Sequence, residues 1–339
     1  TFVRNDLASE VLQAMTFTDA DWTDYDGDGD QDLLIVGTGE SSQPVVRIYE
    51  NDQGTFFDTD ASLPTVLAGA ARWGKRTADG YADVLLTGSV DGVPQTEVYH
   101  YENGGWNKTA SDFVSVGDLG SSYVDWADYD QDGDLDVVLT GSTASSIKYS
   151  KIYRNDEGNY IDIEATLAVV SDGVVQWGDY DGDGDLDLAL AGDGWFEFVG
   201  KVYRNDGGQF VDIGADITPV GVSSLRWGDY DNDGDLDLLL HGIDTDWVTH
   251  TYIYEYDGNS FVETELFLGF GTSYVDWADY DHDGDFDIIA TGSLVESENI
   301  TTRVFENNDK AFSDLLMDLP GAILGQVQWI NIDLSLIHI

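Results

Sequence analysis

The chain has 339 residues, with 66 Asp and Glu against 14 Lys and Arg and no cysteine, so its formal net charge is −52. So few cations exclude a basic face for nucleic acid or an anionic membrane surface. The lack of cysteine excludes disulfides and thiolate catalysis. No apolar run approaches the roughly 18 residues of a membrane-spanning helix, so no membrane insertion is expected. Yet 42% of the residues are hydrophobic, which suffices for a large core.

A tryptophan recurs every 50 to 53 residues, at Trp22, Trp73, Trp126, Trp177, Trp227, Trp277 and Trp329. A second landmark keeps the same spacing and reads (Val/Ile)-(Tyr/Phe)-x-(Asn/Tyr). It occurs at residues 48–51, 98–101, 152–155, 202–205, 253–256 and 304–307, and residues 1–5 fit as a seventh copy. Such a period indicates a repeat architecture.

Each repeat predicts four strands in the same order. The first strand ends at the tryptophan, and the second is a short apolar run, such as residues 33–36, after an Asp-rich loop. The third is the Val-Tyr landmark, and the fourth carries an aromatic residue. These aromatics are Phe56, Trp106, Tyr160, Phe210, Phe261 and Phe312. Four strands in about 50 residues are typical of a β-propeller blade.

We therefore expect one all-β domain over residues 1–333, a seven-bladed β-propeller of four-stranded blades. Six repeats are complete, and the seventh blade is expected to be split between the chain ends, with residues 326–329 beside residues 1–5. The alternative is a fragment of a longer array. Residues 334–339 depart from the repeat. They are either a non-native tail or an apolar strand that pairs at the seam or with another subunit.

Five loops after the tryptophans share the pattern Asp-Tyr-Asp-x-Asp-Gly-Asp-x-Asp. Five carboxylates in nine residues repel one another unless a cation lies among them. Oxygen ligands without His or Cys favour calcium over zinc or copper. We expect one Ca²⁺ per loop, about five in all. The loop acids are Asp24, Asp26, Asp28, Asp30 and Asp32; Asp128, Asp130, Asp132, Asp134 and Asp136; Asp179, Asp181, Asp183, Asp185 and Asp187; Asp229, Asp231, Asp233, Asp235 and Asp237; and Asp279, Asp281, Asp283, Asp285 and Asp287.

The expected ligands in each loop are the side chains at positions 1, 3, 5 and 9 and the carbonyl of position 7, which Gly at position 6 presents. The position-7 side chains are expected to face solvent. An acidic turn without a metal is the alternative. In the second repeat, Lys75 and Thr77 replace the first two acids, while Asp79 and Asp83 remain. There we expect the turn without calcium, with Lys75 or Arg76 near the two acids or simply solvated.

The sequence resembles the FG-GAP/VCBS repeat family through the pattern Asp-x-Asp-x-Asp-Gly-x-x-Asp, which occurs in all five loops. The resemblance covers residues 1–333. It implies a seven-bladed propeller, as in integrin α-subunit heads, with calcium used for structure in an extracellular, bacterial-type surface protein. Family members act in adhesion, in carbohydrate association or as modules of large surface proteins.

Two further features bear on partners. Trp195 and Trp247 lie outside the repeat pattern, between second and third strands, where they would contact a glycan or a protein or else cover blade faces. Asn107 and Asn299 begin Asn-x-Thr triplets, which are glycosylation sites only in a glycosylating host.

No His lies in a recognisable nucleophile pattern, so no catalytic residue is assigned and no enzymatic activity is expected. We expect an extracellular or cell-surface protein with a structural or adhesive role, either as a module or as a subunit of a larger, filamentous assembly. The expected partners are other surface proteins, glycans or copies of itself, and not nucleic acid. A carbohydrate-binding module is the alternative, and an enzyme is less favoured.

Overall fold

The computed structural model describes residues 15–39, 43–74, 82–102, 104–109, 112–117, 122–266, 268, 270–294, 299–317, 319–321, 329–332 and 335–338. The chain divides into two compact units. Unit 1 comprises residues 1–164 and 330–337, and unit 2 comprises residues 165–329 and 338–339. The described residues contain no helix long and apolar enough to cross a membrane.

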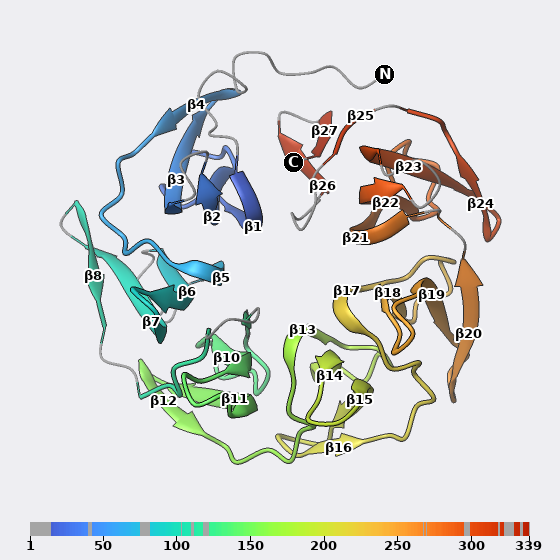
Figure 1. Cartoon of the computed structure of the whole chain (residues 1–339), viewed down its shortest axis with the longest axis horizontal. Coiled ribbons are helices and arrows are strands. Elements are labelled where there is room, and N and C mark those ends of the chain that lie inside the picture. Colours follow the sequence, from blue (N-terminus) through green and yellow to red (C-terminus); the bar gives the residue numbers. More distant parts are fainter. Residues whose placement is uncertain are drawn as a thin grey trace. The chain divides into compact units, whose positions relative to one another are not determined.

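Unit 1 contains three four-stranded antiparallel blades, each formed by one contiguous repeat (Figure 1). The first blade is β1 (Met15–Thr23), β2 (Asp32–Gly39), β3 (Pro44–Asp52) and β4 (Thr55–Asp58). The second is β5 (Leu67–Gly74), β6 (Asp83–Val90), β7 (Val93–Glu102) and β8 (Gly105–Lys108). The third is β9 (Tyr123–Ala127), β10 (Asp136–Ser142), β11 (Lys148–Asp156) and β12 (Asn159–Asp162).

Unit 2 repeats this arrangement in its own three blades. The fourth blade is β13 (Ser171–Gly178), β14 (Asp187–Asp193), β15 (Phe198–Asn205) and β16 (Phe210–Asp212). The fifth is β17 (Gly221–Gly228), β18 (Asp237–Ile243), β19 (Thr249–Tyr256) and β20 (Phe261–Leu266). The sixth is β21 (Phe270–Ala278), β22 (Asp287–Leu294), β23 (Ile300–Asn308) and β24 (Ala311–Asp314), with β25 (Leu319–Pro320) also on β23.

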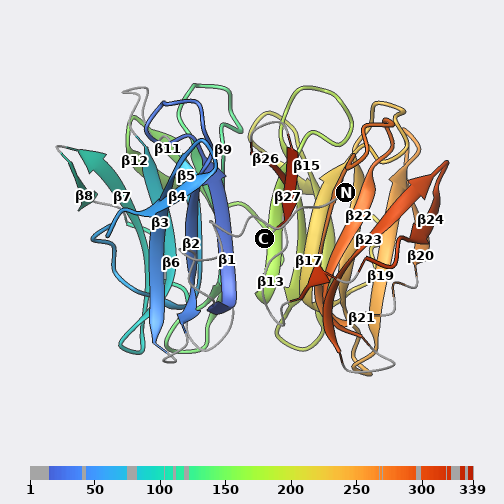
Figure 2. The same ribbon diagram turned by 90° about the horizontal axis from the view of Figure 1, so that it is seen from above.

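The strand order follows the sequence pattern. The predicted tryptophan strands, apolar strands, Val-Tyr strands and aromatic strands form in that order and pair as neighbours, and Figure 2 shows β1, β2 and β3 running side by side. The second strand β2 is buried along nearly its whole length, and the adjacent blade of the same unit packs against it. In one core cluster, Leu34 and Ile48 of the first blade pack with Val84 and Leu86 of the second. Full burial of such a side chain contributes about 1.5–3 kcal/mol.

The prediction of seven blades is wrong, because the described residues form six blades. Trp329 lies in β26 (Trp329–Ile332), which pairs with β27 (Ser335–His338) in a two-stranded sheet. A hairpin closes a much shorter loop than pairing with residues 1–5 requires, so its entropy cost is smaller. Residues 1–5 themselves lie outside the described residues.

Candidate metal centres

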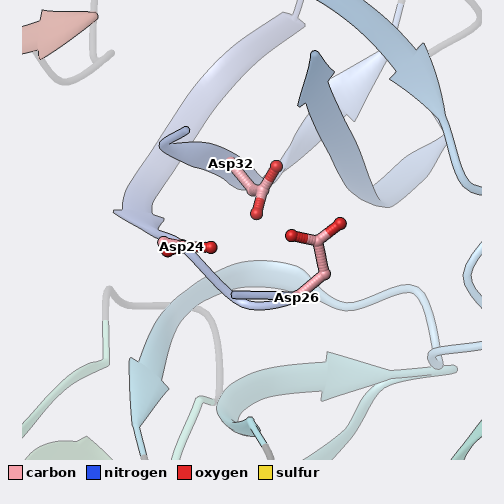
Figure 3. Close-up of side chains that lie close together, drawn as sticks. All are labelled: Asp24, Asp26 and Asp32. Atoms are coloured by element: carbon pink, nitrogen blue, oxygen red, sulfur yellow. The ribbon is translucent and has the colours of Figure 1, made fainter. Parts of the chain in front are cut away.

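All five Asp-rich loops connect the first strand of a blade to the second. In each, one carboxylate oxygen from positions 1, 3 and 9 lies within 4.8 Å of the others. Figure 3 shows this for Asp24, Asp26 and Asp32 in the first blade. The remaining groups are Asp128, Asp130 and Asp136; Asp179, Asp181 and Asp187; Asp229, Asp231 and Asp237; and Asp279, Asp281 and Asp287. Local chain geometry therefore gathers three of the four predicted side-chain ligands in every loop.

The position-9 Asp is the buried anchor of the site. Asp32 begins β2 and is fully buried. Its Oδ2 accepts the Tyr25 backbone N–H at 3.0 Å, and its Oδ1 accepts the Asn51 backbone N–H at 2.8 Å. Asp136, Asp187, Asp237 and Asp287 make the same pair of contacts in their blades. One carboxylate thus holds both the loop and the third strand.

The position-1 Asp shapes the turn. Asp24 Oδ2 accepts the Gly29 backbone N–H at 3.1 Å, and the other four loops repeat this contact at 3.0 or 3.1 Å. Gly29 has a φ of +102°, a left-handed conformation that glycine adopts without steric cost. This turn brings positions 1 and 3 toward position 9, and its backbone conformation requires glycine at position 6.

The side chains at positions 5 and 7 are placed differently from those at positions 1, 3 and 9. Asp28, at position 5, is exposed, and its Oδ1 accepts the Asp30 backbone N–H at 2.9 Å. The position-5 carboxylates are not in the gathered groups of the described residues, so their role as ligands stays a prediction. The position-7 side chains are half-buried rather than free in solvent. Asp30 Oδ2 accepts the Gln53 backbone N–H at 2.8 Å, and Asp134 and Asp285 likewise hold the turn after the third strand.

Sequence reasoning missed the function of the asparagine in the Val-Tyr landmark. Asn51 donates from Nδ2 to the Gln31 carbonyl at position 8 of the loop, at 3.0 Å, and its Oδ1 accepts the Gly54 backbone N–H. Asn155 and Asn205 make both contacts, and Asn307 makes the first. The recurrence of Asn one strand after four of the five loops is the signal that could have revealed this.

The pKa values of the position-9 carboxyls are raised, which favours a bound cation. Burial is the main cause that raises the pKa of the position-9 carboxyls, to about 6 for Asp32 and Asp287 and to about 7 for Asp136, Asp187 and Asp237. Neighbouring loop acids add to the rise. A buried carboxylate is normally satisfied by hydrogen bonds, a charged partner or a metal.

Two buried carboxylate oxygens test whether a metal fits. Asp128 Oδ1 and Asp179 Oδ1, both at position 1, are buried and accept no hydrogen bond. Such orphaned acceptors are rare in folded proteins. They belong to the gathered triads, and every gathered donor is an oxygen. The residues therefore suit a hard divalent cation.

Three of the Asp-rich loops contact the next blade through their position-2 tyrosine. Tyr25 stacks on Trp73 of the second blade, with ring centroids 5.4 Å apart. Within unit 2, Tyr180 stacks on Trp227 at 6.1 Å and Tyr230 on Trp277 at 6.0 Å. These three tryptophans thus join a loop to the next blade.

The second blade differs from the others in its loop sequence, where Lys75 and Thr77 replace the first two acids. Most of its loop, with Lys75, Thr77 and Asp79, lies outside the described residues, so the two readings of Lys75 stay open. Asp83, which begins β6, is fully buried, and its Oδ1 lies 2.9 Å from His100 Nδ1. Sequence reasoning did not single out His100. The available signal was that His100 follows the landmark tyrosine, in the strand that pairs with the Asp at the start of the second strand.

The side chains predicted to contact partners are exposed. Trp195 lies between β14 and β15 with 53% exposure beside Phe196, and Trp247 lies between β18 and β19 with 77% exposure. About half of the Trp195 surface is covered and Trp247 is mostly exposed, so contact with a partner and local covering of a blade face both stay predictions for these tryptophans. Asn107 and Asn299 are also exposed, and their glycosylation stays a prediction.

A family model described as the FG-GAP-like repeat matches residues 77–139 and 179–240. No curated protein matches the chain. Among solved structures, the lectin of Aleuria aurantia in complex with α-methyl-L-fucoside shares 10% identity, with 91% of this chain and 97% of the lectin covered and a TM-score of 0.52. A second structure of that lectin, described as a six-bladed β-propeller, gives 9% identity, 91% and 98% coverage and a TM-score of 0.50.

AofleA from Arthrobotrys oligospora is similar at 9% identity, with 92% of this chain and 91% of AofleA covered and a TM-score of 0.50. At such identities these similarities show the fold alone. An α-L-arabinofuranosidase from Fusarium graminearum also matches, at 14% identity, with 86% and 92% coverage and a TM-score of 0.45.

The expectation that the chain is not an enzyme is therefore corrected, because enzymes are among its structural matches. This likeness is too low to assign a reaction to the chain. The predicted resemblance to the FG-GAP family is confirmed by the two matched segments, both of which include a second strand and its preceding loop. The chain is a β-propeller of six blades that carries FG-GAP-like repeats.

Proposed function

We propose that the chain is a calcium-binding β-propeller, in which each of five loops holds one Ca²⁺ and thereby fixes the blade edges. The observation that carries this proposal is the same in every loop: three carboxylates gathered within 4.8 Å. Buried, unpartnered oxygens of Asp128 and Asp179 support it. A bound cation supplies the positive charge that offsets their repulsion.

The chain's own residues prepare each site. In the first loop, Asp32 is held rigidly by two backbone N–H groups, and Gly29 turns Asp24 back toward it. Asp26 comes from the exposed side and completes the triad. Because Tyr25 stacks on Trp73, fixing the conformation of this loop also fixes its contact with the second blade. We infer that the metals serve stability and that the protein works outside the cell, where calcium is abundant.

Calcium binding is tested by flow dialysis with the full chain. We expect about five Ca²⁺ per chain and a loss of one for each double substitution Asp24→Asn/Asp26→Asn or Asp179→Asn/Asp181→Asn. Chelation lowers the melting temperature, because a ligand that binds only the folded state stabilises it by mass action. A chain that binds no Ca²⁺ at millimolar concentration contradicts the proposal.

Carbohydrate binding is the second candidate, and the exposed aromatic residues favour it. Trp195, Phe196 and Trp247 offer large faces on which a sugar ring can stack, all on connections between second and third strands. The fold is shared with a lectin solved in complex with α-methyl-L-fucoside, which supports the candidate without assigning a sugar. Adhesion at the cell surface would then proceed through glycans.

A glycan array tests this candidate directly. Binding that falls at least tenfold in Trp247→Ala, and that survives in the control variant Phe57→Ser, supports it. Phe57 is a comparably exposed aromatic on β4, remote in sequence from both tryptophans. Absence of binding, or equal loss in both variants, contradicts it.

A further inference from the structure

The turn between β23 and β24 in the sixth blade is unlike its counterparts. It consists of Asp309 and Lys310, and both have positive φ, at +55° and +67°. A two-residue hairpin turn of this kind favours glycine at its second position. The equivalent second positions are Gly54, Gly158 and Gly208, with φ near +90°. Lys310 alone among these four places a long side chain in a conformation that disfavours it.

The substitution also breaks a hydrogen bond. In the other three blades the turn glycine donates its N–H to the landmark asparagine, as Gly54 does to Asn51 Oδ1 at 2.8 Å. In the sixth blade the corresponding Asn307 Oδ1 is buried and accepts no hydrogen bond. Lys310 thus adds backbone strain and leaves an orphaned acceptor. Local strain of this kind is retained where the side chain has a role.

The role is visible in the contacts of the ammonium group. Lys310 Nζ lies 2.6 Å from Asp231 Oδ2 and 3.0 Å from Glu255 Oε2, and 5.6 Å from the ring centre of Tyr230. Asp231 is the position-3 acid of the gathered triad in the fifth blade. Among the ion pairs of the described residues, this one involves a position-3 carboxylate, and the other pairs do not.

The turn that carries Lys310 is itself fixed by the metal loop of its own blade. Asp285, at position 7 of that loop, accepts the Asp309 backbone N–H at 3.3 Å. From the fifth blade, Asn232 Nδ2 donates to the Gly284 carbonyl and to Asp285 Oδ1. Two neighbouring loops and the turn therefore form one connected group. This framework places the ammonium of Lys310 at Asp231.

We infer that Lys310 is a built-in competing cation, which makes the loop of residues 229–237 the weakest of the five calcium sites. This inference rests on the proposed calcium binding and deepens it. An ammonium on a ligand oxygen both occupies that oxygen and repels a divalent ion. A unit charge beside a divalent ion in a water-like dielectric weakens binding by about tenfold.

Calcium titration of the full chain by isothermal calorimetry tests the inference. The wild-type chain is expected to show one site about tenfold weaker than the rest, which disappears in Asp229→Asn/Asp237→Asn. Lys310→Met keeps the strained turn but removes the charge, and Lys310→Gly also restores the turn of the other blades. Both variants should bring the weak site to the affinity of the others, and Lys310→Gly should melt higher than Lys310→Met in chelator.

Lys201→Met is the matched control, because Lys201 pairs with Asp212, outside the acidic loops, at 2.9 Å. It removes the same charge and should leave the weak site weak. Five equal sites in the wild-type chain overturn the inference, as does a weak site that persists, or weakens further, in Lys310→Met. A chain that binds no calcium at all refutes the proposed function, and that result differs from five equal sites.

Discussion

The position-9 carboxylate of the third blade offers a decisive test, because its substitution should have opposite effects with and without calcium. Asp136 is fully buried and accepts the backbone N–H groups of Tyr129 and Asn155 at 3.0 and 2.7 Å. In Asp136→Asn the shape is preserved and the charge is removed. The new amide can accept from one of these groups, and its own NH₂ faces the other.

The expected size follows from the structure. Burial, chiefly, raises the pKa of Asp136 from 3.8 to about 7. That difference corresponds to roughly 4 kcal/mol of destabilisation of the metal-free fold at high pH. One N–H left unsatisfied costs about 1–3 kcal/mol. In chelator Asp136→Asn should therefore be about 1–3 kcal/mol more stable than the wild-type chain. At a calcium concentration of 100 times Kd, it should forgo about 2.7 kcal/mol of ligand stabilisation.

Urea unfolding at pH 8, with chelator and with calcium, measures both effects. Asp83→Asn is the control, since Asp83 occupies the same buried strand start in the blade whose loop has lost its first two acids. Its effect should be the same in both conditions. The reasoning is refuted if Asp136→Asn destabilises the chain in chelator by more than about 1 kcal/mol, since the carboxylate would then be a required acceptor. It is also refuted if calcium stabilises this variant as much as the wild-type chain.

Three further outcomes are expected. The folded-state pKa of Asp187 is about 7, above its ordinary value of 3.8. The metal-free fold should therefore gain stability as pH falls from 8 to 5. Over the same pH range, calorimetry should show that calcium binding becomes weaker. Arg72→Met should cost about 3–5 kcal/mol in urea unfolding, because it leaves Asp19, its buried ion-pair partner on β1, without a counter-charge. Calcium removal should change the intrinsic fluorescence of the chain through the Tyr25–Trp73 stack, and Tyr25→Leu should reduce that change.

Local structure could be predicted from the sequence because each repeat carries its own signals. The tryptophan strand, the apolar run and the Val-Tyr strand lie next to one another in the chain, and the described residues repeat this order in six blades. The triad of positions 1, 3 and 9 was also predictable, since Gly29 and its counterparts bring residues eight apart in sequence together. The contact of the position-7 acid Asp30 with Gln53 could not be predicted, because Gln53 belongs to another strand connection.

The number of blades could not be derived in this way. Trp329 matches the first-strand pattern as well as Trp277 does. A blade forms, however, only where further strands are available to pair with the tryptophan strand. The structure places residues 335–338 beside it, and the sequence pattern gave those residues no place in the repeat. Lys310 was missed for a similar reason. Its partner Asp231 is 79 residues away, and no local periodicity relates a turn of one blade to a loop of another.

The second blade separates two roles of the position-9 carboxylate. Asp83 is as deeply buried as Asp32, although Lys75 and Thr77 replace the first two acids of its loop. A buried carboxylate retained without those ligands needs another partner, and His100 Nδ1 lies 2.9 Å from it. The carboxylate at a second-strand start must therefore stabilise the strand junction irrespective of metal. His100→Ala should then destabilise the chain equally with calcium and with chelator in urea unfolding, whereas a calcium-dependent loss would show that the second loop binds metal after all.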